Sequence, residues 1–138
     1  MTDCVFCRIV AGDLPATFVY QDDAVVGFLD LFPVVPGHTL VVPRRHATDL
    51  LDCPADLAGR LFAASGRVAA AVLAATGADG FNVWSANGPA AGQTVFHLHL
   101  HVLPRFAADQ FGLRFPIERR EASRGELDAV AARIRRKV

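Results

Sequence analysis

The sequence predicts an α+β domain in which an antiparallel five-stranded sheet carries helices on one face. Five short segments rich in valine, leucine and phenylalanine are separated mostly by turns or loops, which is typical of antiparallel neighbours. One long, alanine-rich segment instead repeats its apolar residues at helical spacing. The chain has 138 residues, of which 52% are hydrophobic, so we expect a single domain over 1–138 with a sizeable core.

The first half of the chain holds three of the predicted strands. Residues 17–21 and 24–29 form a predicted hairpin joined by a tight Asp-Asp turn. A loop with two prolines and a glycine follows over 30–37, and residues 38–43 form the third strand.

The long helix is predicted over 54–76. Pro54 suits its first turn, and Gly77 suits its end. Its apolar stripe consists of Leu57, Leu61, Val68 and Val72. The last two strands are predicted at 80–85 and 96–104, with a glycine-containing loop between them.

The C-terminal region begins with residues 105–122, which show no clear pattern. Ser123 and Glu126 form a capping box, which predicts a last helix starting at Ser123. Its apolar side consists of Leu127, Val130 and Ile134. We interpret the cations near its end as helix-dipole partners rather than a nucleic-acid or membrane patch; they are Arg133, Arg135, Arg136 and Lys137.

Charge and cysteine content narrow the functional classes. The 14 basic and 14 acidic residues balance, whereas a nucleic-acid surface favours a basic excess. No signal peptide is visible, and no apolar run approaches the roughly 18 residues that span a bilayer. Three cysteines are an odd number, which argues against a disulfide framework. We therefore expect a cytoplasmic protein with no nucleic-acid or membrane partner.

Three histidines alternate in the segment His97-Leu98-His99-Leu100-His101. In a β-strand they share one face, while the leucines face the core. Each imidazole can change charge near neutral pH. The pattern therefore indicates a reactive or ligand-binding face rather than an ordinary wet strand face.

Two kinds of chemistry suit such a face. The imidazoles could bind a transition metal, since this ligand suits Zn, Cu, Fe and Ni. Alternatively, one imidazole could attack a phosphate ester while its neighbours hold the oxygens and move protons. The preceding loop, Gly92-Gln93-Thr94, favours the second chemistry. Glycine lets the backbone approach an anion, and the amide and hydroxyl can donate hydrogen bonds to phosphate.

The segment GPAAGQTVFHLHLHVLPR resembles the signature of the histidine triad family of nucleotide hydrolases and transferases. The upstream segments CVFCRIVAGDLPATFVYQDDAVVGFLD and PVVPGHTLVVPRRH are similar to the family in its usual order. The resemblance implies a HIT-like fold with a triad core over 4–105. Residues 106–138 match only loosely, as a variable C-terminal region.

The resemblance implies four catalytic residues. His99 is similar in position to the family's nucleophile, which attacks the α-phosphorus of a nucleoside monophosphate derivative and forms a nucleotidyl-histidine intermediate. His101 corresponds to a phosphate contact, and His38 corresponds to a fourth histidine that supports the triad. Thr94 would form a hydrogen bond near the leaving group.

It also implies a nucleotide-binding site. Asp30 would accept the ribose hydroxyls, and Gly92, Gln93 and Thr94 would join His99 and His101 around the phosphate. Three apolar residues would surround the base, although each could equally be a core residue; they are Phe6, Ile9 and Phe28. Ala86 stands where many relatives carry an amide, so Asn87 is the candidate to replace that contact.

The pair Cys4-x-x-Cys7 is half of a zinc site, and alone it is a weak signal. Two thiols in a short N-terminal helix or loop would look the same. A subgroup of the family completes such a pair with the histidine after VVPRR and the first triad histidine, which are His46 and His97 here. The resemblance thus implies a closed structural zinc site, which would remove His97 from proton transfer.

Together these features imply an enzyme acting on the α-phosphate of purine nucleoside monophosphate derivatives, such as phosphoramidates and dinucleoside polyphosphates. No catalytic metal is required, the expected partner is a small nucleotide, and the family's usual assembly is a homodimer. A non-catalytic nucleotide-binding or scaffold protein with the same fold is the alternative. The retained His99 favours the enzyme.

Overall fold

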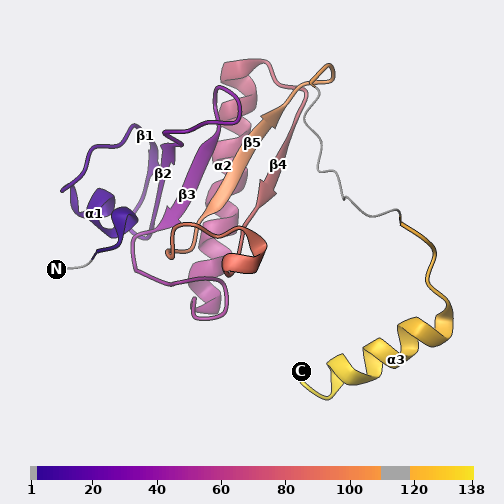
Figure 1. Cartoon of the computed structure of the whole chain (residues 1–138). Coiled ribbons are helices and arrows are strands. Elements are labelled where there is room, and N and C mark those ends of the chain that lie inside the picture. Colours follow the sequence, from indigo (N-terminus) through magenta and orange to yellow (C-terminus); the bar gives the residue numbers. More distant parts are fainter. Residues whose placement is uncertain (1–2, 110–118) are drawn as a thin grey trace.

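The computed structural model describes residues 3–109 and 119–138. Its five strands form one antiparallel sheet in the order β1-β2-β3-β5-β4 (Figure 1). The strands are β1 Phe18–Gln21, β2 Val25–Leu29, β3 Thr39–Pro43, β4 Gly80–Trp84 and β5 Leu100–Arg105. The predicted α+β class and five-stranded sheet are confirmed, and the histidine-bearing β5 lies inside the sheet between β3 and β4.

Helix α2, Ala55–Thr76, lies along one face of the sheet (Figure 1). Its buried stripe packs on strand residues that share one face; this core includes Val25, Val41, Leu61, Val68, Val72, Leu98 and Val102. Gly27 in β2 allows a close approach, because an added Cβ would lie 3.2 Å from the Tyr20 Cβ and 3.6 Å from a Val68 methyl. The helix predicted over 54–76 is therefore confirmed in extent and in its buried side.

Among the described residues, α2 is also the one helix long and apolar enough to cross a bilayer by length and composition. The sequence shows no uninterrupted apolar run there, because Asp56, Arg60 and Arg67 break it. Seven residues of the helix are buried against the sheet. Its apolar character is accounted for by that core packing.

The short helix α1, Val5–Ala11, packs on the opposite face of the sheet. Phe6 and Ile9 contact a second core formed by Val26, Phe28, Leu40 and Val42, which alternate with the residues that face α2. The sequence predicted helices on one face only. The physical reason for the difference is that consecutive residues of β2 and β3 are buried, so both faces need cover.

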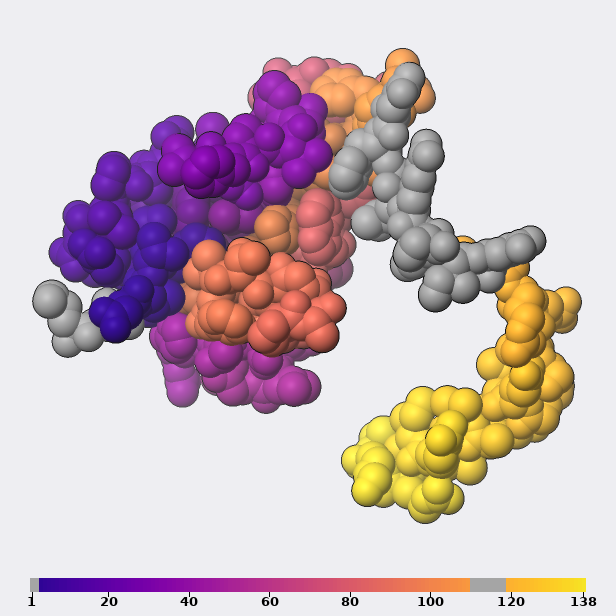
Figure 2. Space-filling model, in the orientation of Figure 1, coloured from indigo at the N-terminus to yellow at the C-terminus, as the bar shows by residue number. Residues whose placement is uncertain are grey.

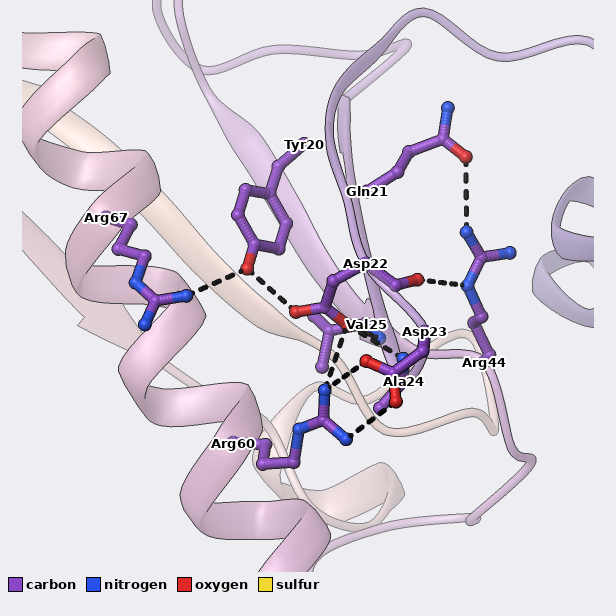
Figure 3. Close-up of polar contacts among 9 residues, drawn as sticks. All are labelled: Tyr20, Gln21, Asp22, Asp23, Ala24, Val25, Arg44, Arg60 and Arg67. Atoms are coloured by element: carbon purple, nitrogen blue, oxygen red, sulfur yellow. Dashed lines mark hydrogen bonds and ion pairs between the residues drawn. The ribbon is translucent and has the colours of Figure 1, made fainter.

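The β1–β2 turn is fixed by Asp22, whose carboxylate accepts hydrogen bonds from the backbone N–H groups of Ala24 and Val25, both at 2.8 Å (Figure 3). Arg60 of α2 forms ion pairs with Asp22 and Asp23 across the turn. The turn therefore joins the hairpin to the helix that covers it.

Strand β5 begins at Leu100, later than the predicted start at Phe96. His97 and His99 consequently precede the strand, and Phe96 is half exposed. The last pair between β3 and β5 is Val41 with Leu100. Two residues further along β3 is Pro43, which has no N–H to continue the ladder.

The last helix, α3, spans Arg124–Arg135, and Ser123 and Glu126 form the predicted capping box. None of its residues is buried, and it stands apart from the sheet (Figures 1 and 2). The apolar side that the sequence predicted is therefore present but uncovered. Part of the predicted C-terminal region, residues 110–118, lies outside the described residues.

Candidate active site and metal centre

A cavity of about 930 Å³ opens on the side of the sheet that carries α1. Its apolar wall includes Phe6, Ile9, Phe28 and Leu40, and its polar residues are Thr17, Asp30, Thr94, His99 and His101. A smaller cavity of about 330 Å³ lies on the α2 side, and no histidine or cysteine lines it. The first cavity is therefore where this chain combines an apolar pocket with reactive side chains.

His99 reaches this cavity with a defined tautomer. Its Nδ1 lies 2.7 Å from the backbone carbonyl oxygen of His97, and a carbonyl can only accept, so Nδ1 carries the proton. Nε2 therefore keeps its lone pair. Burial lowers the pKa of His99, although the hydrogen bond to His97 opposes that effect. The ring is thus a neutral imidazole at neutral pH, with an unprotonated nitrogen available for attack.

His38 and His101 form a directional hydrogen-bond chain. The backbone N–H of Val34 donates to His38 Nδ1 at 3.2 Å, so His38 carries its proton on Nε2. That proton is donated to His101 Nδ1 at 2.9 Å, which leaves the His101 proton on Nε2. Burial, followed by the charges of His99 and His38, lowers the pKa of His101 to about 4. His101 is therefore a neutral hydrogen-bond donor that lines the cavity.

Asp30 lies just after β2, on the cavity wall. One carboxylate oxygen accepts from the backbone N–H of Phe32 at 2.9 Å, and the other lies 3.6 Å from His38 Nε2. Asp30, His38 and His101 bring ligand atoms within 4.8 Å of one another, as an ion would also require. Since His101 Nδ1 already accepts from His38, we interpret this group as a hydrogen-bond chain.

Two residues assigned to the nucleotide are engaged elsewhere. Gln93 is buried; its carbonyl accepts from the N–H of Gly88, and its amide donates to the Thr48 and Val95 carbonyls. Asn87 accepts from the backbone N–H of Leu50 at 2.8 Å. Neither side chain is among the cavity-lining residues. Both shape the loops around the site.

Gly92 ends the short 3₁₀ turn η1, Pro89–Ala91, with φ of 86°, a conformation that favours glycine. The exposed Thr94 follows it on the cavity edge. The loop therefore presents Thr94 beside the histidines while Gln93 points inward. Phe6, Ile9 and Phe28 belong to the second core, and they also line the cavity.

Sequence reasoning missed Trp84. It stands directly opposite His101 in the β4–β5 pairing, and the two rings stack at a centroid distance of 4.7 Å and an angle of 9°. Both strands were predicted, but their register cannot be read from alternation alone. One sequence signal could have indicated Trp84: it is the single tryptophan of the chain, and it lies at the end of the predicted strand before the histidines.

The triad does not converge on one point, because His97 turns towards Cys4, Cys7 and His46. Its Nδ1 lies 3.4 Å from the Cys4 sulfur, 3.5 Å from the Cys7 sulfur and 3.1 Å from His46 Nδ1. A tetrahedral zinc ion with bonds of about 2.0–2.3 Å separates its ligand atoms by roughly 3.3–3.8 Å. The ligand atoms of these four side chains are thus about as far apart as the ligands of one metal ion. The three triad histidines do not form such a group with one another.

Neighbouring groups prepare these side chains for a metal. His97 Nε2 lies 2.8 Å from the Pro43 carbonyl, so it carries the proton and leaves Nδ1 bare. The backbone N–H of Cys7 donates to the Cys4 sulfur at 3.4 Å, where Cys4 caps α1. Cys4, Cys7, His46 and His97 could therefore hold a metal ion.

The fold and the cavity define an α+β protein that presents a neutral imidazole with an unprotonated nitrogen beside an apolar pocket. The model of the HIT domain family matches residues 11–108. The chain therefore belongs to the HIT family.

Similar proteins extend the match. The structure of SMU.412c from Streptococcus mutans UA159 is 44% identical with a TM-score of 0.93, covering 99% of this chain and 86% of that chain. A Zn-bound histidine triad family protein from Mycobacterium smegmatis is 40% identical with a TM-score of 0.78, covering 99% and 98%. The adenylylsulfatase HINT3 of Arabidopsis thaliana is 38% identical over 107 residues, which are 78% of this chain and 54% of that protein.

Proposed function

We propose that the protein is a nucleotide hydrolase or nucleotidyl transferase that acts on the α-phosphate of purine nucleoside monophosphate derivatives. One observation carries this proposal: His99 donates its Nδ1 proton to the His97 carbonyl and keeps the Nε2 lone pair at the cavity. The similarity to an adenylylsulfatase supports an adenylyl group as the part that is recognised.

In the proposed reaction, His99 Nε2 attacks the α-phosphorus, and the bond from phosphorus to the leaving group breaks. The imidazole then carries positive charge, which the His97 carbonyl stabilises through the Nδ1 proton. The leaving atom takes a proton from solvent, and the hydroxyl of Thr94, on the cavity edge, donates a hydrogen bond to that atom. Water finally attacks the nucleotidyl-histidine and releases the nucleoside monophosphate together with free His99.

The neighbouring groups suit the rest of the substrate. The His101 Nε2 proton would stabilise the negative oxygens as charge develops on them. Asp30 would accept hydrogen bonds from the ribose hydroxyls, and the Phe6, Ile9 and Phe28 wall would pack against the base. Gly92, Gln93 and Asn87 would act through the loop that holds Thr94 in place.

We also propose that Cys4, Cys7, His46 and His97 hold a structural zinc ion. The donor set of two thiolates and two imidazoles is one that zinc accepts, and a Zn-bound relative has this fold. Such an ion would fix α1 against the segment before β5, and the site would have no open position for substrate. The proposed reaction requires no metal at the phosphate.

A homodimer and a cytoplasmic location complete the proposal. The homodimer follows from the family resemblance, and the cytoplasmic location follows from the odd number of cysteines. Size-exclusion chromatography with light scattering measures the mass of the assembly. A mass of one chain, 14.8 kDa, would contradict the dimer.

The decisive assay compares the wild-type protein with His99→Ala on an adenosine phosphoramidate, with release of adenosine monophosphate as the readout. We expect turnover by the wild type and at least a 10²-fold loss in the variant. Equal turnover by both would contradict the nucleophile. Nucleotide binding with no turnover by either would indicate the binding or scaffold protein.

A further inference from the structure

Trp84 and His101 are direct cross-strand neighbours on β4 and β5. Side chains of such a pair project from the same side of the sheet. The indole and the imidazole are nearly parallel, at 9°, with centroids 4.7 Å apart. One face of the His101 ring is therefore covered by Trp84, although none of the roles described above requires an aromatic residue there.

The hydrogen bond from His38 does not by itself fix the His101 ring. A bond at Nδ1 constrains one atom, and the ring can still tilt about the line from Nδ1 to His38. Half a turn about the Cβ–Cγ bond would also replace Nδ1 by a carbon. During that turn an edge of the ring must sweep through the space that the Trp84 indole occupies. The stack thus blocks the motions that the hydrogen bond leaves open.

We propose that Trp84 is a positioning residue for His101, which holds the imidazole plane so that Nε2 points at the substrate phosphate. The inference rests on the proposed function for the role of His101. The groups that face His101 are His38 just before β3, Asp30 after β2, His99 in the segment before β5 and Trp84 on β4. Trp84 is the one among them that does not titrate. Its action is therefore geometric.

The first experiment observes the ring directly, without substrate. Nitrogen-15 NMR of histidine-labelled protein distinguishes the two neutral tautomers of an imidazole. In the wild type we expect His101 in one form, with Nε2 protonated and Nδ1 bare. In Trp84→Leu we expect averaged signals, and in Trp84→Phe the single form should return. Trp84→Met provides a second non-aromatic variant if Trp84→Leu does not fold.

The second experiment measures kinetics on the adenosine phosphoramidate. We expect Trp84→Leu to lower kcat about tenfold with KM changed less than about twofold, because a misplaced donor acts mainly on the transition state. Trp84→Phe should recover most of kcat. Phe81→Leu is the matched control, since Phe81 is a half-exposed aromatic residue on the same strand, opposite Pro104. Its kcat should equal that of the wild type.

The outcomes separate this inference from the proposed function. Two tautomers of His101 in the wild type, or a single tautomer and full kcat in Trp84→Leu, would overturn the role of Trp84. An equal loss in Phe81→Leu would also overturn it, since the effect would belong to the strand. If no protein turns over substrate, the proposed function fails, and the tautomer comparison still decides whether Trp84 holds the ring.

Discussion

His97 and His99 are joined by a hydrogen bond from the His99 imidazole to the His97 carbonyl, at 2.7 Å. The His97 side chain points the other way, into the group of two cysteines and His46. One residue therefore contributes its ring to the candidate metal centre and its backbone to the proposed nucleophile. Disturbing the first site should change the second.

Replacing both ligand cysteines tests this connection. In Cys4→Ser/Cys7→Ser we expect loss of bound metal and a decrease of about 3–4 kcal/mol in the free energy of unfolding, as for loss of a ligand present at 100–1,000 times its dissociation constant. We also expect lower kcat, because the His97 carbonyl loses its support. Elemental analysis and urea unfolding measure these effects. Cys53→Ser is the control that keeps the metal, and full metal content in the double variant would refute the four-ligand site.

The pH dependence follows from the lowered pKa of His101, which burial and the charges of His99 and His38 bring to about 4. Protonation of His101 occupies the Nδ1 lone pair that accepts the hydrogen bond from His38, so it breaks the hydrogen-bond chain between the two residues. Burial also lowers the pKa values of His99 and His38. We therefore expect kcat/KM to persist as pH falls through 6.5 and to decline at lower pH. Half-loss near 6.5, with metal content unchanged, would contradict this expectation.

The same shift affects stability in a defined direction. An exposed histidine in the unfolded chain has an ordinary pKa near 6.5 and binds a proton before folded His101 does. The contribution of His101 to the free energy of unfolding is therefore complete above pH 6.5 and decreases as pH falls towards 4. Urea titrations at several pH values check the sign.

A substitution of Gln93 tests whether the Gln93 side chain holds the loop before the histidines in place. Gln93→Ala removes three hydrogen bonds and leaves buried backbone groups without a partner, so we expect the free energy of unfolding to drop by about 2–3 kcal/mol, with lower activity. The neighbouring control, Thr94→Ala, should lower activity and leave stability unchanged. A Gln93→Ala protein of full stability but weak phosphate binding would restore a direct contact of Gln93 with the substrate.

The packing of α2 gives a pair of adjacent variants. Leu61 is 2% exposed in the main core, whereas its neighbour Phe62 is 66% exposed. Leu61→Ala should cost about 2–5 kcal/mol, and Phe62→Ala should change the free energy of unfolding by less than about 0.5 kcal/mol. Urea unfolding of both decides the point. Equal losses would mean that Phe62 is covered in the folded assembly.

Much of the fold follows from local pattern. The alternation of 17–29, the helical stripe of α2 and the Ser123 capping box all depend on neighbours in sequence, and each was predicted close to its observed extent. The position of α1 was not, because nothing local shows that both faces of β2 need cover. The late start of β5 depends on Pro43, a residue of another strand.

The site divides in the same way. His99, His101 and Thr94 were found from the alternating histidines and the loop before them, and Asp30 was found from the family resemblance. The cavity brings these four residues together. The inward turn of Gln93 and the stack of Trp84 on His101 depend on loop conformation and strand register. Alternation assigns a side chain to a face, but not to a partner on the next strand.

The position of Trp84 also gives the protein an optical reporter of its own. The chain has one tryptophan, so all of its indole emission comes from a ring stacked on His101. A protonated imidazole withdraws electrons from an excited indole and quenches it, while a neutral one does so far less. Emission from the unlabelled protein therefore follows the protonation of His101 and of His38, whose ring centroid lies 6.2 Å from the indole, and a pH titration of the fluorescence records it without a label.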